Sequence, residues 1–194
     1  TGHCGRTLQN GDKLTAVINK NAKTKVPLKC PINGDTPTPL RGVRLEQPTG
    51  LLRAIVGPEY HHFSKAAHQY FWQHDWTIAP NSNRMGCRLE NTDGKTLSID
   101  STKLTENMRS HAVFCGVVQV PTDGKPIILM VDAQSTGGYP RFATVIQADL
   151  WQLSCIPPKK AVRFIRCDQA TAIDAIKQRQ QATYRLTLAT NHTR

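Results

Sequence analysis

The sequence predicts a mainly β fold, a barrel or a sandwich, with two peripheral helices. Short apolar runs rich in β-branched residues recur along the chain, and turns containing Gly or Pro separate them. Only two segments space their apolar residues as an amphipathic helix does, and no internal repeat is present. With 194 residues, of which 39% are hydrophobic, the chain is long enough for one domain, or for one domain and a piece of another.

The N-terminal part differs in composition from the rest. Residues 1–18 contain Leu8–Leu14 (LQNGDKL), which indicates a turn between two short strands, and we expect the C-terminal remnant of a preceding β domain. Residues 19–45 are rich in Lys, Asn, Thr and Pro and bury little, so we expect a linker. The chain opens with Thr rather than Met, from which we expect a fragment. Limited proteolysis should cut first within 19–41, and first cuts within 112–146 would contradict these boundaries.

The predicted barrel domain, residues 46–168, begins with a strand and a helix. Residues 51–56 (LLRAIV) have strand character and end at a Gly-Pro pair. Ser64 can cap the helix predicted over 65–74, whose alanines and aromatic residues fall at helical spacing. Residues 76–79 (WTIA) indicate a short strand that follows this helix.

The middle of the domain alternates turns and strands. A polar turn over 81–86 leads into a short strand at 87–89, and residues 91–110 are polar and weakly patterned. The apolar runs 111–120 and 127–131 flank a turn with Pro and Gly, so we expect a β-hairpin.

The last part of the chain holds a strand and the second helix. Residues 143–146 form another apolar run, and 148–153 indicate one or two helical turns. An alternating strand is predicted over 161–165. Asp168 can cap a final helix over about 169–188, with a tail to residue 194.

Charge and composition exclude several classes of protein. The formal net charge of +11 suggests an anionic partner, but the Lys and Arg residues are scattered, aromatic residues make up 6%, and no nucleic-acid-binding module is present. We therefore expect a solvated basic surface with local anion sites, and no nucleic-acid partner. No apolar stretch approaches the roughly 20 residues that span a bilayer, and no signal peptide is visible.

The cysteines favour a reducing compartment. None of the six forms a Cys-x-x-Cys pair or a zinc-ligand spacing. Cys115, Cys155 and Cys167 stand among apolar residues, so we expect them to be small buried side chains and the protein to be cytoplasmic.

The first candidate site is the loop Asp132–Arg141 (DAQSTGGYPR), which follows one apolar run and precedes another. Gly137 and Gly138 let a ligand approach the main chain. Several side chains around them can donate hydrogen bonds, namely Gln134, Ser135, Thr136, Tyr139 and Arg141. The pattern predicts a small anion or amide site, and a tight turn between buried strands is the alternative.

Two further segments carry polar groups at strand ends. Gly57–Phe63 (GPEYHHF) holds Glu59 and His61, which can do acid–base work, although a solvated helix-entry turn is the alternative. We expect no metal there, because the adjacent histidines point apart on a regular strand and three convergent ligands are needed. Ser82–Arg88 (SNRMGCR) places two guanidinium groups beside a glycine, which favours binding of carboxylate or phosphate over ordinary surface salt bridging.

Familiar nucleotide and nucleophile motifs are missing. Gly94–Thr96 resembles the end of a Walker A loop, but Leu89 stands where its first glycine should be. Neither a Rossmann fingerprint nor a nucleophile elbow occurs. A nucleotide would therefore need an unconventional site or one shared with another chain.

Together these segments resemble one family. Arg53–Tyr60, Ser82–Arg88, Gly116–Pro121 and Asp132–Arg141 occur in this order in allophanate hydrolase subunit 2, the KipA proteins, the carboxyltransferase part of urea amidolyase and the C subunit of 5-oxoprolinase. The resemblance runs from about residue 43 to 170 and is most specific in the last motif. Gly-Pro-Glu-Tyr-His and Ser-Asn-Arg-Met-Gly are similar to the branch that holds the C subunit of bacterial 5-oxoprolinase.

The resemblance implies a cyclophilin-like β-barrel over about 46–167 and a B subunit, of the KipI or allophanate hydrolase subunit 1 type, as partner. It also implies that a separate A subunit is needed to complete the enzyme. The implied reaction is the ATP-dependent opening of the 5-oxoproline lactam to L-glutamate. One alternative is a biotin-dependent carboxyltransferase of urea breakdown, in which the related region accepts a carboxyl group from carboxybiotin. Another is a regulatory, non-catalytic binding module of the KipA type.

Under the first reading the candidate residues take roles. Three arginines would neutralise a carboxylate or a transferring phosphate: Arg84, Arg88 and Arg141. The amide would be held by Asn83, Gln134 and the backbone of Gly137 and Gly138, and Thr136 would also bind substrate or phosphate. The catalytic candidates are Glu59, His61, Gln134 and Tyr139. Such preorganised donors stabilise developing charge.

The chain also departs from the family pattern. Cys87 stands where relatives often have Tyr, and Ala112 and Cys115 replace a usual Gly and Pro. These changes affect the expected site, whereas Pro158–Lys160 in place of Pro-Gly-Asp changes only a loop. Family members carry an N-terminal half with its own Gly-rich motif, which this sequence lacks, so we expect the isolated chain to be inactive.

Overall fold

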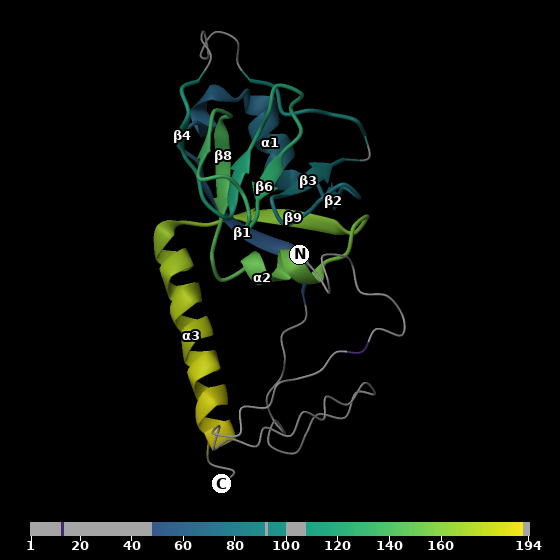
Figure 1. The fold of residues 1–194 in the computed structure, drawn as a ribbon. Coiled ribbons are helices and arrows are strands. Elements are labelled where there is room, and N and C mark those ends of the chain that lie inside the picture. The colour runs from purple at the N-terminus through teal and green to yellow at the C-terminus, as the bar shows by residue number, and fades with distance from the viewer. Residues whose placement is uncertain (1–12, 14–47, 92, 100–107, 192–194) are drawn as a thin grey trace. The chain divides into compact units, whose positions relative to one another are not determined.

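The computed structural model describes residues 13, 48–91, 93–99 and 108–191 (Figure 1). Among these residues, strands close a barrel in the order β1-β8-β5-β6-β3-β2-β9. The barrel strands are β1 (Leu51–Val56), β2 (Trp76–Ile78), β3 (Gly86–Glu90), β5 (Val117–Gln119), β6 (Ile127–Leu129), β8 (Arg141–Val145) and β9 (Ala161–Arg166). The predicted class, a mainly β barrel with peripheral helices, is confirmed.

The remaining elements surround the barrel. A separate two-stranded sheet pairs β4 (His111–Ala112) with β7 (Thr136–Gly137). The helices are α1 (Lys65–Gln73), α2 (Leu150–Cys155) and α3 (Gln169–Asn191), and a short 3-10 turn, η2, spans Tyr60–His62. In Figure 1, α3 runs down one side and carries its C-terminal half away from the strands. Among the described residues, no helix combines the length and the apolar character needed to cross a membrane.

Closure of the barrel depends on β1, which pairs with β8 antiparallel and with β9 in parallel. These pairings join strands from opposite ends of the domain, and Leu52 lies opposite Phe164. Closing the sheet leaves no unpaired barrel edge for another chain to add to. The side chains of β1 alternate between interior and exterior, so Leu52 and Ala54 are fully buried while Leu51 is exposed.

Helix α1 packs an aromatic cluster against the barrel. Its residue Phe71 is fully buried, and its ring lies 4.5 Å from that of Phe142 on β8 and 4.4 Å from that of Phe164 on β9. The predicted N-cap is present, because Ser64 Oγ accepts a hydrogen bond from Ala67 N at 3.1 Å. Burial of each large side chain contributes about 1.5–3 kcal/mol, which makes this cluster a main anchor of the fold.

The predicted hairpin is confirmed, but its first strand is shorter than expected. β5 pairs with β6 antiparallel, while the run before it breaks at Gly116, whose φ is +98°. A Cβ there would lie 2.9 Å from Val145 O, so this position requires glycine. The break separates β4 from β5 and lets His111–Ala112 pair with the Gly-Gly loop.

The prediction of three buried cysteines is wrong. Cys155 is exposed, and Cys115 and Cys167 are half-buried. Cys155 ends α2, which turns Gln152 and Leu153 inward. Of the four cysteines in the described ranges, Cys87 on β3 is the buried one. Burial raises the pKa of its thiol to about 11, although a hydrogen bond with Ser82 acts in the opposite direction.

The other predicted boundaries have different outcomes. The strand predicted over 161–165 and the final helix are present, and Asp168 Oδ1 accepts a hydrogen bond from Thr171 N at 2.8 Å. The β-domain remnant over 1–18 and the linker over 19–45 lie outside the described residues, except for Lys13. Those two assignments stay predictions.

Candidate functional site

The Gly-Gly loop is brought against the segment that precedes β5. The two strands of the small sheet place His111 opposite Gly137 and Ala112 opposite Thr136. A further backbone bond joins Val113 N to Ser135 O at 3.0 Å. The loop is therefore part of a hydrogen-bonded structure, with main-chain groups on both strands.

The last residue of the loop forms a bidentate ion pair with a candidate acid. Arg141 donates from Nε to Glu59 Oε2 at 2.8 Å and from Nη2 to Glu59 Oε1 at 2.6 Å. Its backbone N–H donates to the same carboxylate at 3.0 Å. The exposed fractions of the two side chains are 21% for Arg141 and 13% for Glu59, so the pair is largely shielded from water.

This pair keeps Glu59 ionised. Burial raises the pKa of the carboxyl, but the hydrogen bonds and charge of Arg141, with a smaller contribution from His111, outweigh burial and leave the pKa below its ordinary value. A carboxylate in this state orients its partner and is a poor proton donor near neutral pH. A ligand anion would have to share Arg141 with Glu59. Both residues lie at the predicted site, and their predicted roles stay predictions.

The first residue of the loop is also held by an ion pair. Arg84 donates from Nε to Asp132 Oδ2 at 2.6 Å and from Nη2 to Oδ1 at 3.1 Å. Asp132 N donates in turn to Arg84 O at 2.9 Å. This pair is exposed to solvent and contributes little to stability by itself. The three sequence-predicted segments nevertheless meet at the loop: Arg84 of the second segment pairs with its first residue, and Glu59 of the other segment pairs with its last residue.

The other candidates lie on the same segments with less contact. Asn83 Oδ1 accepts bonds from Met85 N at 2.9 Å and Gly86 N at 3.2 Å, so this amide shapes its own turn. Exposed side chains follow on β3, on η2 and on the loop, namely Arg88, His61, Gln134, Thr136 and Tyr139. Since they face solvent, a ligand or a partner chain can reach them.

A buried glutamine under the loop was missed by the sequence reasoning. Gln119 on β5 is 2% exposed, and its Nε2 donates to Tyr139 O at 3.3 Å. A Cβ on Gly137 would lie 2.6 Å from that Nε2, so a larger residue there would force the buried amide of Gln119 to shift. A polar residue inside the apolar run Val117–Val120 was the available signal.

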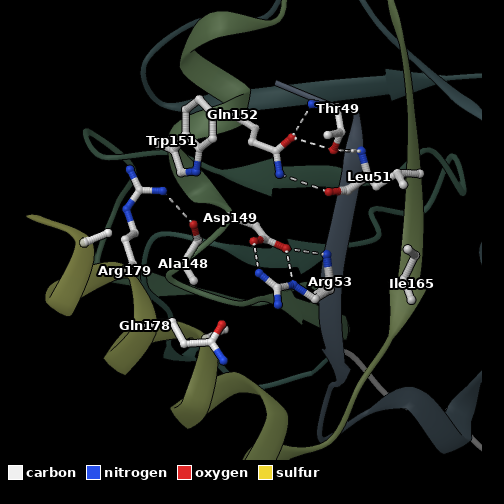
Figure 2. A pocket seen from close by; sticks show the side chains of 12 residues that line it. Thr49, Leu51, Arg53, Ala148, Asp149, Trp151, Gln152, Ile165, Gln178 and Arg179 are labelled. Carbon is white, nitrogen blue, oxygen red and sulfur yellow. Dashed lines mark hydrogen bonds and ion pairs between the residues drawn. The ribbon is translucent and has the colours of Figure 1, made fainter. Parts of the chain in front are cut away.

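A second polar concavity lies on the outer face of the barrel, between β1, β9, α2 and α3 (Figure 2). Its volume is about 510 Å³. Asp149 is 4% exposed, and its carboxylate accepts bonds from Arg53 N, Nε and Nη2 at 2.8, 2.9 and 2.6 Å. Arg179 of α3 lies 5.0 Å from the centre of the Trp151 ring and donates to Ala148 O at 2.9 Å.

The polar groups of this concavity mainly connect secondary-structure elements. Gln152 Oε1 accepts a bond from Thr49 N at 2.9 Å, and its Nε2 donates to Leu51 O at 3.0 Å. Because the buried Asp149 and Gln152 already have protein partners, the arrangement joins α2 to β1. Elsewhere in the described ranges, no three His, Cys, Asp or Glu side chains are placed to hold a metal ion.

Comparison with known proteins identifies relatives of this chain. The chain is 37% identical over 177 residues to the C subunit of 5-oxoprolinase from Escherichia coli (strain K12), covering 91% of this chain and 51% of that protein. It is 39% identical over 160 residues to the C subunit of the Haemophilus influenzae 5-oxoprolinase, covering 82% of this chain and 45% of that protein. This chain therefore spans about half the length of these curated relatives.

More distant relatives agree on the fold. Urea amidolyase of Saccharomyces cerevisiae is 25% identical over 169 residues, covering 84% of this chain and 9% of that protein. The crystal structure of the K. lactis urea amidolyase superposes with a TM-score of 0.64 at 19% identity, over 70% of this chain and 8% of that one. The family described as the carboxyltransferase domain, subdomains A and B, matches residues 1–166. With that match over most of its length, the chain belongs to the family of carboxyltransferase domains, subdomains A and B.

Proposed function

We propose that this chain is part of the C subunit of an ATP-dependent 5-oxoprolinase, which opens the 5-oxoproline lactam to L-glutamate together with a B and an A subunit. The observation that carries the proposal is the identity of 37% and 39% to the C subunits of two curated 5-oxoprolinases over most of this chain. Three of the motifs that carry the family resemblance also meet at one loop.

The chemistry of the loop suits such a substrate. A lactam with a carboxylate offers a carbonyl oxygen and an anionic group, and both accept hydrogen bonds. Donors would come from the backbone of Gly138 and from the exposed side chains of Gln134 and Thr136, whereas the backbone of Gly137 pairs with His111 in the small sheet. Arg88 is exposed on β3 and suits a carboxylate. Preorganised donors of this kind stabilise the negative charge that develops on the carbonyl oxygen.

The ion pairs of the site separate residues that hold the loop from residues that are open to the substrate. Arg141 and Arg84 are each engaged by a carboxylate, so we assign them to holding the loop before any contact with substrate. His61 and Tyr139 remain the candidates for proton transfer.

ATP would bind on a partner subunit or at a shared surface, since the sequence has no Walker A loop. We place the complex in the cytoplasm and expect the isolated chain to be inactive.

The test uses the full-length C subunit assembled with its B and A subunits. ATP hydrolysis and glutamate formation are measured with and without 5-oxoproline. The proposal expects 5-oxoproline to stimulate both, and Arg88→Ala to raise the KM for 5-oxoproline. If 5-oxoproline stimulated neither ATP hydrolysis nor glutamate formation, the proposal would be rejected.

Two alternatives have support of their own. The match to urea amidolyase favours a biotin-dependent carboxyltransferase, which carboxybiotin-dependent carboxylation of urea would reveal. An apolar groove of about 470 Å³ is lined by Phe114, Ile173 and Ile176, and Phe114 is 62% exposed. Exposed apolar surface of this kind marks protein-interaction sites, so the groove favours a regulatory binding module. That module would bind its partner and leave 5-oxoproline unchanged.

A further inference from the structure

One nitrogen beside the Gly-Gly loop lacks the hydrogen bond that its burial demands. Among the described residues, two buried side-chain nitrogens have no partner, namely His62 Nδ1 and His111 Nε2. Buried polar atoms are nearly always hydrogen-bonded, because leaving one unpaired costs free energy. An unpaired atom at a candidate site is therefore a candidate contact for a ligand.

His111 lies within the candidate site. As part of β4 it pairs with Gly137, and the carbonyl of the next residue, Ala112, accepts a bond from Arg141 Nη1 at 3.3 Å. Its imidazole is close enough to Glu59 for the two side chains to influence each other electrostatically. Glu59 and Arg141 are thus the charged side chains beside it, and each already holds the other.

The other ring nitrogen determines what the buried one can do. His111 Nδ1 lies 3.2 Å from the carbonyl oxygen of Arg109. A carbonyl oxygen only accepts hydrogen bonds, so Nδ1 carries the proton in the neutral ring. Nε2 then presents a lone pair, and it needs an N–H or O–H donor.

This lone pair differs from the other acceptors of the site, which are exposed amide and hydroxyl oxygens such as those of Gln134, Ser135 and Thr136, because it is buried and unpaired. The loop's donors suit a carbonyl or a carboxylate, while a secondary amide also has an N–H to satisfy. We propose that His111 Nε2 accepts the hydrogen bond of the substrate's ring N–H, and so selects unsubstituted lactams. The proposal rests on the proposed function and deepens it, since it names the group that recognises the lactam nitrogen.

The first measurement reads the contact without turnover. The assembled complex carries 15N-labelled histidine in this chain only. The 15N NMR signal of His111 Nε2 is assigned by its loss in His111→Phe. Addition of 5-oxoproline should shift that signal, and the N-methylated lactam, which has no N–H, should not. A signal that ignores both compounds, or that moves equally with both, would overturn the proposal.

The second measurement uses steady-state kinetics. His111→Phe keeps an aromatic ring but has no acceptor, and it should raise the KM for 5-oxoproline by ~10-fold, with a smaller change in kcat. His111→Gln restores an acceptor and should recover part of this loss. His74→Phe is the matched control, because His74 Nδ1 also lies 3.2 Å from a carbonyl oxygen, that of Tyr70, but the residue is exposed at the end of α1.

The outcomes separate this inference from the proposed function. An unchanged KM in His111→Phe would reject the role of His111 even if the complex is an active 5-oxoprolinase. Conversely, a selective shift of the Nε2 signal in a complex that makes no glutamate would support lactam binding and reject the proposed reaction.

Discussion

The ion pair between Glu59 and Arg141 should stabilise both the fold and the site. The change to make is Arg141→Met, which keeps most of the side-chain stem but removes the guanidinium. It leaves a carboxylate that is only 13% exposed without its partner. Removal of one member of a fully buried pair costs about 3–5 kcal/mol. Because Arg141 is 21% exposed, we expect a loss at the lower end of that range, about 3 kcal/mol.

A double-mutant cycle isolates the pair. Glu59→Gln, Arg141→Met and the double variant are unfolded in urea at pH 7, and the free energies of unfolding are compared. We expect a coupling energy of about 2 kcal/mol, since hydrogen bonds to charged groups are worth about 1.5–3 kcal/mol. Arg84→Met is the control, because that pair is exposed and should cost less than about 1 kcal/mol. A coupling energy below about 0.5 kcal/mol would refute the reasoning.

The pH dependence of stability provides an independent check. The folded-state pKa of Glu59 lies below its ordinary value of 4.5. A carboxyl with a depressed folded pKa contributes stability above its unfolded pKa and loses that contribution as pH falls through the folded pKa. The wild-type chain should therefore lose this contribution as pH falls below about 4.5, and Arg141→Met should not show that part of the loss. Urea titrations at a series of pH values measure the difference.

Three further substitutions, with Gly138→Ala as a control, test the packing of the domain, each by urea or thermal unfolding. Gly57→Ala would place a Cβ 2.0 Å from a backbone carbonyl oxygen of β8, so we expect a loss of about 3 kcal/mol or more. Gly137→Ala would place its Cβ 2.6 Å from Gln119 Nε2 and should cost about 1–3 kcal/mol. In the control Gly138→Ala, the new Cβ meets nothing closer than 3.4 Å, so the loss should be smaller. Equal losses in the two variants would contradict this packing. Asp149→Ala leaves a guanidinium without its carboxylate, and we expect about 2–4 kcal/mol; a loss within about 0.5 kcal/mol would show that the pair does not join α2 to β1.

Local patterns in the sequence were enough for most elements, and they also located the segments of the candidate site, whose roles stay predictions. The strand character of 51–56 before a Gly-Pro pair predicted β1, and the alternation of apolar residues predicted β9. The capping residue Ser64 predicted the start of α1. All these signals depend on neighbours that are close in the chain. The motif segments around Glu59, Asn83 and Gly137 were also found from sequence, since Gly, Arg and amide side chains concentrate there.

Only the tertiary structure decided how those residues pair. Glu59 and Arg141 are 82 residues apart, and Arg53 and Asp149 are 96 apart, so no local pattern could join them among the many charged residues of the chain. The same holds for Gln119, which became part of the site only when β5 placed it under the loop. Sequence by itself determined the class of fold and the loop that carries the candidate chemistry. Closure of the barrel determined which charges neutralise each other and which nitrogen is left unpaired, because strand pairing brings together groups that are distant in the chain.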